Sequence, residues 1–257
     1  MSIYFGDLNW PQLQEKIEKN AVILIPVGTV EEHGRHLPVS TDAVIASEIA
    51  GRTAEKVKDE LPLLVTPTVW TGYSAKEMTR WPGTIRIRPE VLIDLIYDLL
   101  TSLAEMGFKK IVLLDCHGHH SGILNVAVRK ASDAFGIYPA VVSPAALSKD
   151  VFAEIRKSET GGAIHGGEWE TSLMLYFGRP VNMAEATKKD VMRYHSEFIP
   201  GDNFIGGKGV FWSTWGIQQS KSGIYGDPTV ASIETGEKCC RAIIKNLSRF
   251  LKEYRAK

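Results

Sequence analysis

Short, continuous apolar runs alternate along this chain with longer segments in which apolar residues recur every three or four positions, and this alternation limits the folds open to it. The runs are rich in β-branched residues, as expected of strands buried on both faces, and lie at 21–28, 63–69, 110–115 and 138–143. Helices are expected between them at 43–60, 89–108 and 122–135, and again at 233–255. Repeated strand–helix–strand units predict an α/β fold with a mainly parallel sheet covered by helices.

The composition fits one domain spanning 1–257, because 44% hydrophobic and 23% charged residues can fill one large core. Lys plus Arg and Asp plus Glu both number 30, so no net charge draws the chain to nucleic acid or anionic lipid, and we expect a small-molecule partner. No apolar run approaches the ~20 residues of a membrane span, and the first ten residues do not resemble a signal peptide. Three cysteines, two of them adjacent, are a poor disulfide framework, so we expect a cytoplasmic protein.

Histidines gather where the expected strands end. Ligands of an open parallel sheet bind beyond the carboxyl ends of its strands, so these positions are the ones that matter for function. Six of the seven histidines fall in three windows, 28–42, 115–122 and 163–176. They are His33, His36, His117, His119, His120 and His165.

Carboxylates accompany the histidines in a pattern typical of a metal centre. Mixed carboxylate and imidazole ligands suit zinc, manganese or iron better than calcium or magnesium. Glu31 and His33, two apart on an extended segment, point the same way, and Asp42 returns after a short loop. His117 arrives from the neighbouring strand end. These four residues are therefore predicted to converge on divalent cations.

Each ligand also has a structural interpretation. Of Glu31 and Glu32, one is expected to be a solvated loop carboxylate, and we favour Glu32 for that role. Asp42 precedes a helix and could be its N-cap, and single histidines such as His36 are more often surface or packing residues. The convergence of three windows favours the metal site over these alternatives.

Four motifs resemble the creatininase (creatinine amidohydrolase) family: PVGTVEEHGRHLPVSTD, LLDCHGHHSG, HGGEWETS and GIYGDPTVASIETGE, with WPGT at 81–84 in addition. The resemblance runs from the first strand to the last helix. It implies a three-layer α/β/α fold, a two-metal site holding zinc with manganese or iron, hydrolysis of carbon–nitrogen bonds in small, often cyclic amides, and a homo-oligomer, commonly a hexamer.

The resemblance also implies roles for single residues. Glu31 and His117 match ligands of one metal, His33 a ligand of the other, and Asp42 the bridge between them. Where creatininase has a glutamate two residues after the motif histidine, this chain has His119, which could be a ligand or a substrate contact.

The third motif offers a replacement for that glutamate. Glu168 is predicted to supply the missing carboxylate, although it could equally be a first-turn residue stabilised by the helix dipole. Glu170, two residues on, points to another face of the same helix and receives an orienting or structural role. His165 matches a pocket histidine and is the candidate to protonate the leaving group or stabilise the oxyanion, the alternative being a helix-start histidine.

Two further regions border the substrate pocket or a subunit contact in the resemblance. Tyr73, Ser74 and Trp81 are predicted substrate contacts after the second strand. A long loop expected at 190–226 contains Phe211, Trp212 and Trp215, for which core or interface packing is the commoner fate of aromatic residues.

The predicted activity is hydrolysis by a metal-activated water. The asparagines of a frequent family motif, NGHGGN, are replaced here by Asp115 and His120, so the substrate does not follow from the resemblance. A carbon–carbon hydrolase of an oxidised inositol-type ring, a deformylase and a non-catalytic metal-binding protein remain as alternatives. The chain has no GxSxG elbow, and Cys116 is expected to pack beneath the site.

Overall fold

The computed structural model describes residues 2–194, 196–199, 201–205 and 209–257. Its central element is a four-stranded sheet in the order β2-β1-β3-β4, in which every neighbouring pair is parallel. The strands are β1 (Val22–Val27), β2 (Leu63–Val65), β3 (Lys110–Asp115) and β4 (Ala140–Val142). In the register of the two central strands Val27 lies beside Asp115, so β1 and β3 end side by side.

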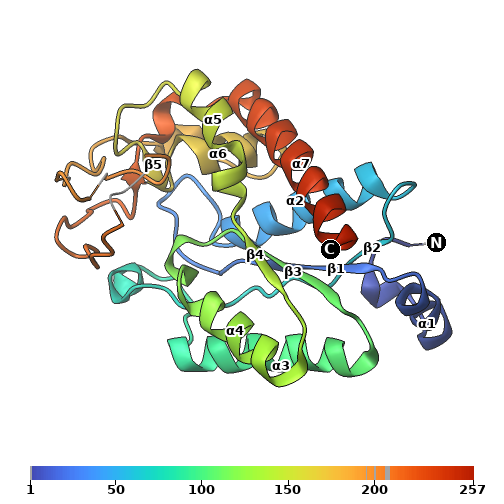
Figure 1. The fold of residues 1–257 in the computed structure, drawn as a ribbon. Helices are drawn as coiled ribbons and strands as arrows, with labels where there is room; N and C mark the ends of the chain where they lie inside the picture. The colour runs from blue at the N-terminus through green and yellow to red at the C-terminus, as the bar shows by residue number, and fades with distance from the viewer. Residues whose placement is uncertain (1, 195, 200, 206–208) are drawn as a thin grey trace.

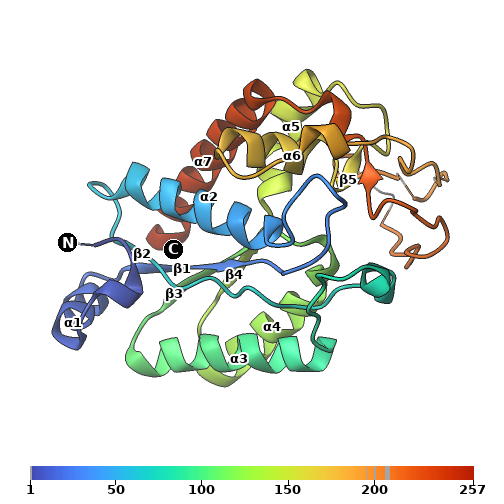
Figure 2. The ribbon, with the colours of Figure 1, turned by 180° about the vertical axis from the view of Figure 1, so that it is seen from behind.

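Helices cover both faces of this sheet (Figures 1 and 2). On one face lie α1 (Trp10–Glu18), α3 (Pro89–Met106) and α4 (Ile123–Phe135); on the other lie α2 (Thr41–Val57), α5 (Pro144–Ile155), α6 (Glu168–Tyr176) and α7 (Ile233–Ala256). The predicted three-layer α/β/α sandwich is confirmed.

Alternation along β1 explains the two cores. Val22 and Leu24 pack with α2 and α7, whereas Ile23 and Ile25 pack with α3 and α4, because successive strand residues point to opposite faces. All four side chains are fully or almost fully buried. A strand apolar at every position is thus required by a sheet covered on both sides.

The strand expected at 110–115 has the bounds of β3, whereas the other three expected strands are longer than the observed ones, and two helices, α1 and α5, were not predicted. Helix α1 has no fully buried residue, and its Leu13 and Ile17 pack against the core as partly buried side chains. Helix α5 begins at Pro144, with the Ser143 hydroxyl accepting a hydrogen bond from the Ala146 amide. These are ordinary start signals, but they follow directly on an expected strand.

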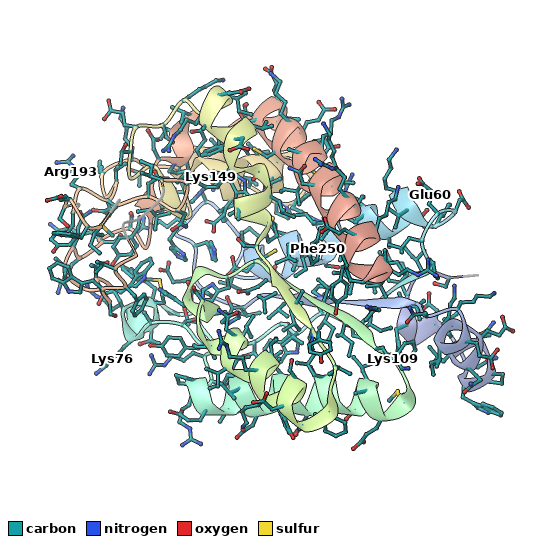
Figure 3. All side chains as sticks on the ribbon, viewed as in Figure 1. Glu60, Lys76, Lys109, Lys149, Arg193 and Phe250 are labelled. Atoms are coloured by element: carbon teal, nitrogen blue, oxygen red, sulfur yellow. The ribbon has the colours of Figure 1, made fainter. Side chains whose placement is uncertain are left out.

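The loops that follow the carboxyl ends of the strands gather at one side of the molecule. Figure 3 shows Lys76 and Arg193 there, and Lys109, just before β3, at the far end. A short antiparallel pair, β5 (Ala163–His165) and β6 (Tyr225–Gly226), lies outside the main sheet. Of the long loop expected at 190–226, positions 195, 200 and 206–208 lie outside the described residues; the rest contains only β6 and a bridge between Trp215 and Gln218. Among the described residues, no helix has both the length and the hydropathy of a membrane-spanning segment.

Candidate metal centre

The loop after β1 turns sharply and returns as α2. A Cβ on Gly28 would lie 2.6 Å from the Ala43 amide nitrogen, so only glycine lets the strand end pass this close to the start of the helix. Asp42, in the first turn of α2, therefore reaches the strand end, where its Oδ2 accepts a hydrogen bond from the Thr29 hydroxyl at 2.7 Å. Asp42 does not cap α2, since the N-cap position is Ser40.

Two groups of three side chains present ligand atoms within 4.8 Å of one another. The first cluster is Glu31, His117 and His119; the second cluster is His33, Asp42 and Glu170. In the first, His117 Nε2 lies 3.5 Å from Glu31 Oε2. In the second, His33 Nε2 lies 3.2 Å from Asp42 Oδ1 and 3.9 Å from Glu170 Oε2.

Asp42 joins the two clusters. Its Oδ1 faces His33, while its Oδ2 lies 2.8 Å from His117 Nδ1. A single buried carboxylate thus contacts a histidine of each cluster. Its position therefore allows one carboxylate to be shared between the two clusters.

The buried polar atoms of the clusters fit a divalent cation. Both Glu31 oxygens, His33 Nε2 and His119 Nε2 are buried without a hydrogen-bond partner within the described part of the chain. A buried carboxylate without donors is costly, and such orphaned atoms call for an explanation. Cations between these atoms would satisfy them, and the mixture of imidazole and carboxylate is the donor set of zinc, manganese and iron.

Charge coupling shifts the pKa values of these groups. Burial lowers the pKa of His117, but Glu31 and Asp42 more than compensate and raise it to about 9. His33 behaves alike: burial lowers its pKa, yet Asp42 and Glu170 raise it well above the usual value. Burial raises the pKa of Asp42, but His33 and His117 bring it well below its usual range. Without metal, protons therefore occupy the sites that cations would take.

His119 differs from the other two cluster histidines. Burial, followed by the nearby His117 and His165, lowers its pKa to about 2. Its imidazole is thus neutral at physiological pH, the form that ligates metals.

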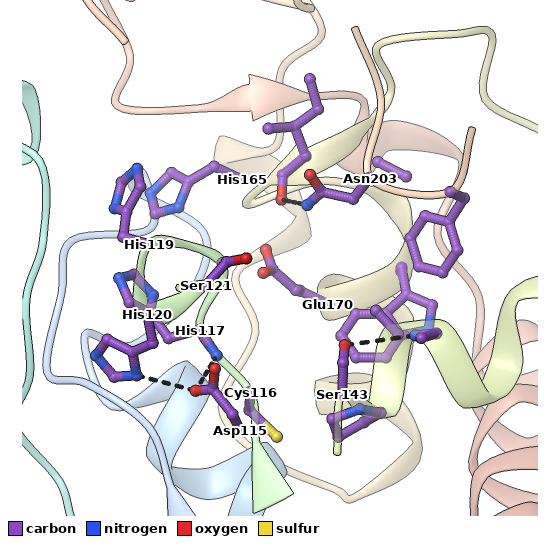
Figure 4. A pocket seen from close by; sticks show the side chains of 18 of the residues that line it. Asp115, Cys116, His117, His119, His120, Ser121, Ser143, His165, Glu170 and Asn203 are labelled. Atoms are coloured by element: carbon purple, nitrogen blue, oxygen red, sulfur yellow. Dashed lines mark hydrogen bonds and ion pairs between the residues drawn. The ribbon is translucent and has the colours of Figure 1, made fainter. Parts of the chain in front are cut away.

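A cavity of about 570 Å³ opens in front of the clusters. Its wall includes side chains of both clusters, Glu31, His117, His119 and Glu170, together with His165 and Trp215. In Figure 4 Glu170 reaches from α6 toward the histidines of the neighbouring loop. The Trp215 ring stands edge-on to His119, with centroids 4.5 Å apart, so an aromatic side chain of the long loop forms part of this wall.

His165, at the end of β5, lies within reach of both clusters. Its Nε2 is 2.7 Å from the Glu32 carbonyl oxygen, and its Nδ1 is 3.4 Å from Glu31 Oε1. The ring packs on His33, with centroids 4.2 Å apart. Burial and His33 lower the pKa of His165, but Glu32 and Glu31 outweigh them and raise it.

Glu170, rather than Glu168, is the third-motif carboxylate that lies in the second cluster. The Glu168 side chain is fully buried, but its oxygens accept hydrogen bonds from the amides of Lys157 and Ser158 at 2.8–3.1 Å. The two glutamates do point to different faces of α6, as the helical period requires. However, Glu170 faces the cavity, where Glu168 was expected. The sequence did not indicate that the backbone amides of residues 157 and 158 would hydrogen-bond to the Glu168 carboxylate.

Other predicted residues lie beside the cavity rather than in its wall. Tyr73 contacts the first cluster through its backbone: its carbonyl oxygen is 3.1 Å from His117 Nε2, the nitrogen that also faces Glu31. Ser74 is fully buried, and Trp81 packs against the Arg80 guanidinium. Glu32 was expected at the surface but is only 4% exposed, because its carboxylate accepts the Gly34 amide hydrogen next to His165.

Two histidines flank the clusters, and two aromatic residues of the long loop are exposed. His36 bonds the Thr171 hydroxyl at 3.0 Å and so joins the loop to α6 as a packing residue. His120 bonds Asp115 behind the first cluster. Phe211 and Trp212 are exposed, at 89% and 52%, and do not line the cavity, unlike Trp215.

Comparisons with known proteins all indicate the same family. The family model described as creatinine amidohydrolase, creatininase, matches residues 6–251. The chain is 28% identical over 178 residues to 3-dehydro-scyllo-inosose hydrolase of Thermotoga maritima, a match that covers 67% of this chain and 55% of that protein. It is 28% identical over 191 residues to creatinine amidohydrolase of Pseudomonas putida, covering 68% and 71% of the two chains. It is also 28% identical over 236 residues to the mycofactocin precursor peptide peptidase of Mycobacterium tuberculosis, covering 88% and 83%.

Solved creatininase structures share the fold. One crystal structure of creatinine amidohydrolase superposes with a TM-score of 0.83 at 22% identity, covering 98% of this chain and 97% of the other. Similar matches are a Zn–Zn type creatininase variant, with a TM-score of 0.83 at 22% identity, and an Mn creatininase, with a TM-score of 0.81 at 22% identity; each covers 98% of both chains. With a family model matched over nearly its whole length, the chain belongs to the creatininase family of hydrolases.

Proposed function

We propose that residues 1–257 form a single metal-dependent hydrolase domain that cleaves a carbon–nitrogen bond in a small, cyclic amide. One observation carries the proposal: two adjacent buried clusters, joined by Asp42, face one cavity together with His165. Two of the relatives, an amidohydrolase and a peptidase, are named for cleavage of amide bonds.

Each cluster would hold one cation. Glu31, His117 and His119 offer two imidazoles and one carboxylate, a set that favours zinc. His33, Asp42 and Glu170 offer two carboxylates and one imidazole, which suits the harder manganese or iron. With Asp42 shared between the two positions, four protein ligands face the first and three face the second, which leaves the second position open to water and substrate.

The side chains around the cavity would then have separate roles in the reaction. A pair of divalent cations, when bound, lowers the pKa of a water molecule and polarises a carbonyl group. His165 donates Nε2–H to the Glu32 carbonyl, which fixes its ring and leaves Nδ1 beside Glu31 in the cavity wall. Because its pKa is raised, His165 can hold a proton at Nδ1 for the leaving nitrogen. Trp215 and the buried loop behind the histidines limit access of bulk water on this side.

The test is a hydrolysis screen of protein loaded with zinc and manganese against creatinine, other cyclic amides, short peptides, formamides and oxidised cyclitols. We expect turnover of an amide, loss of turnover in His165→Gln with metal content unchanged, and no turnover after chelation. Absence of amide cleavage by fully loaded protein would refute the proposal.

A second candidate is a hydrolase of an oxidised cyclitol ring. It is favoured by the relative named 3-dehydro-scyllo-inosose hydrolase, which matches 67% of this chain. The same clusters would serve, since a ring ketone presents the same kind of carbonyl. Cleavage of a cyclitol alone in the screen would select this candidate.

We also propose that the protein is a homo-oligomer, a hexamer, in the cytoplasm. The exposed Phe211 and Trp212 support a subunit contact, because large apolar side chains grouped on a surface commonly mark an interface. Cys116, Cys239 and Cys240 carry free thiols, which is usual in a reducing compartment. Light scattering of the purified protein, with Phe211→Ser/Trp212→Ser as the variant, tests the oligomer.

A further inference from the structure

Two side chains outside the clusters, those of Asp115 and His120, bond to each other across the turn that carries His117 and His119 of the first cluster. Asp115 is the last residue of β3, and His120 is the last residue of the 3-10 helix η3 (Gly118–His120). Asp115 Oδ1 lies 2.9 Å from His120 Nδ1, and the same oxygen accepts the backbone N–H of His117 at 3.2 Å (Figure 4). The two residues that replace the asparagines of NGHGGN are thus bonded to each other.

The His120 ring is held from every side. It is fully buried, and its ring centroid lies 4.8 Å from that of His117 in an edge-on contact. A Cβ on Gly72 would lie 2.0 Å from His120 Nε2, so the loop after β2 closes directly over the ring. His120 Nε2 has no hydrogen-bond partner among the described residues, and the ring therefore depends on Asp115 for its one polar anchor.

His120 belongs to neither cluster, although its neighbours do. His117 and His119, two residues apart on this turn, meet with ring centroids 5.0 Å apart and planes at 81°. Their relative placement is set by the turn, because the His120 amide donates to the His117 carbonyl oxygen at 3.2 Å while Asp115 holds the His117 amide. A carboxylate bonded at both ends of a four-residue turn fixes the ligands inside it.

We propose that Asp115 and His120 are positioning residues that hold His117 and His119 in the geometry of the first metal site, and this inference rests on the proposed metal-dependent function. In this role they act through the two ligand histidines. Supporting residues of this kind typically change metal affinity by about 10- to 100-fold when removed. The effect should be confined to the first site, because His33, Asp42 and Glu170 lie on other elements.

The test compares three variants with the wild-type protein. His120→Phe keeps an aromatic ring and loses the Nδ1–H donor, Asp115→Leu keeps a side chain branched at Cγ and loses the acceptor, and Asp115→Asn keeps an acceptor oxygen for both N–H groups. Zn²⁺ binding is measured by competition with a chromophoric chelator, and the ligand geometry by the visible spectrum of the Co²⁺-loaded protein.

We expect His120→Phe and Asp115→Leu to weaken one Zn²⁺ equivalent about 10- to 100-fold and alter the Co²⁺ spectrum, while the other equivalent stays as in the wild type. Asp115→Asn should rescue both properties. Glu170→Gln, the matched control, should weaken the opposite equivalent. Should Asp115→Leu fail to fold, His120→Phe and Asp115→Asn still decide the outcome.

Unchanged Zn²⁺ affinity and Co²⁺ spectrum in His120→Phe, or equal loss of both equivalents, would overturn the inference. Wild-type protein that binds two equivalents but hydrolyses nothing would refute the proposed function alone. Wild-type protein that binds no Zn²⁺ would refute both.

Discussion

Asp42 is the residue on which both halves of the site depend. It is almost completely buried, yet its carboxylate is surrounded by groups that favour the ionised form: His33 on one oxygen, His117 and the Thr29 hydroxyl on the other. A buried carboxylate of this kind is tolerable only with such partners or a cation. Its two oxygens serve two clusters, and this arrangement makes its loss different from the loss of any other ligand.

Asp42→Ala should therefore remove both cations and abolish hydrolysis while the fold remains. The affinity for each metal should fall by about 100-fold or more, since even supporting residues cost up to that much. Metal content by plasma emission spectroscopy and far-UV circular dichroism measure the two effects. Retention of either equivalent would contradict the bridging position of Asp42.

The two glutamates of α6 give an opposed pair of predictions. Glu170→Gln should lose one metal equivalent and most activity with little change in stability, because Glu170 belongs to the second cluster. Glu168→Ala should keep both metals but lower the free energy of unfolding by about 1–3 kcal/mol, since the Lys157 and Ser158 amides lose their acceptor. Metal analysis and urea unfolding separate the two; loss of metal in Glu168→Ala would contradict the assignment.

At the scale of elements, the site depends on how closely β1 and α2 approach. Gly28 lies against the first turn of α2, where any side chain would meet the backbone of Asp42 and Ala43 at 2.6–2.7 Å. Neither backbone can move without shifting Asp42 relative to β1. The strand end and the helix start therefore behave as one rigid unit.

Gly28→Ala should displace α2 and lower the free energy of unfolding by about 1–3 kcal/mol, the usual cost of overpacking. Metal affinity should fall with it, because Asp42 moves with the helix. Gly6→Ala is the matched control: a Cβ there meets nothing within 4 Å, so both quantities should stay near the wild-type values. Thermal unfolding and Zn²⁺ titration of both variants provide the measurement, and equal behaviour of the two would refute the argument.

The same elements show what the sequence could and could not reveal. Runs of apolar residues identified the four strands of the sheet, and the parallel order then brought the ends of β1 and β3 together, so the convergence of Glu31, His33, Asp42 and His117 followed from topology. The choice between Glu168 and Glu170 depended on the rotation of α6 about its axis, which tertiary packing sets. A helical pattern gives the relation between two faces but does not say which one meets the cavity.

For the whole molecule, protons and cations compete for one site. In the metal-free protein the pKa of His117 is raised to about 9 and that of His33 lies well above 6.5. A raised pKa in the folded state contributes stability that is fully present below the unfolded value, near 6.5, and is lost as the pH rises through the folded value. The apo protein should accordingly lose this contribution between about pH 6.5 and 9.

Metal binding should show the opposite dependence on pH, because a cation must displace the protons on His33 and His117. We expect Zn²⁺ or Mn²⁺ affinity to rise from pH 6 toward pH 9 and the increase in Tm caused by a fixed metal concentration to grow over the same range, since stabilisation by a ligand follows its affinity. Differential scanning calorimetry of apo and loaded protein at several pH values measures this, and calorimetric titration in buffers of different ionisation enthalpy counts the released protons. The Asp42→Ala variant should show neither trend, because it is expected to bind neither cation. A pH-independent increase in Tm in the wild-type protein would mean that the cations bind elsewhere.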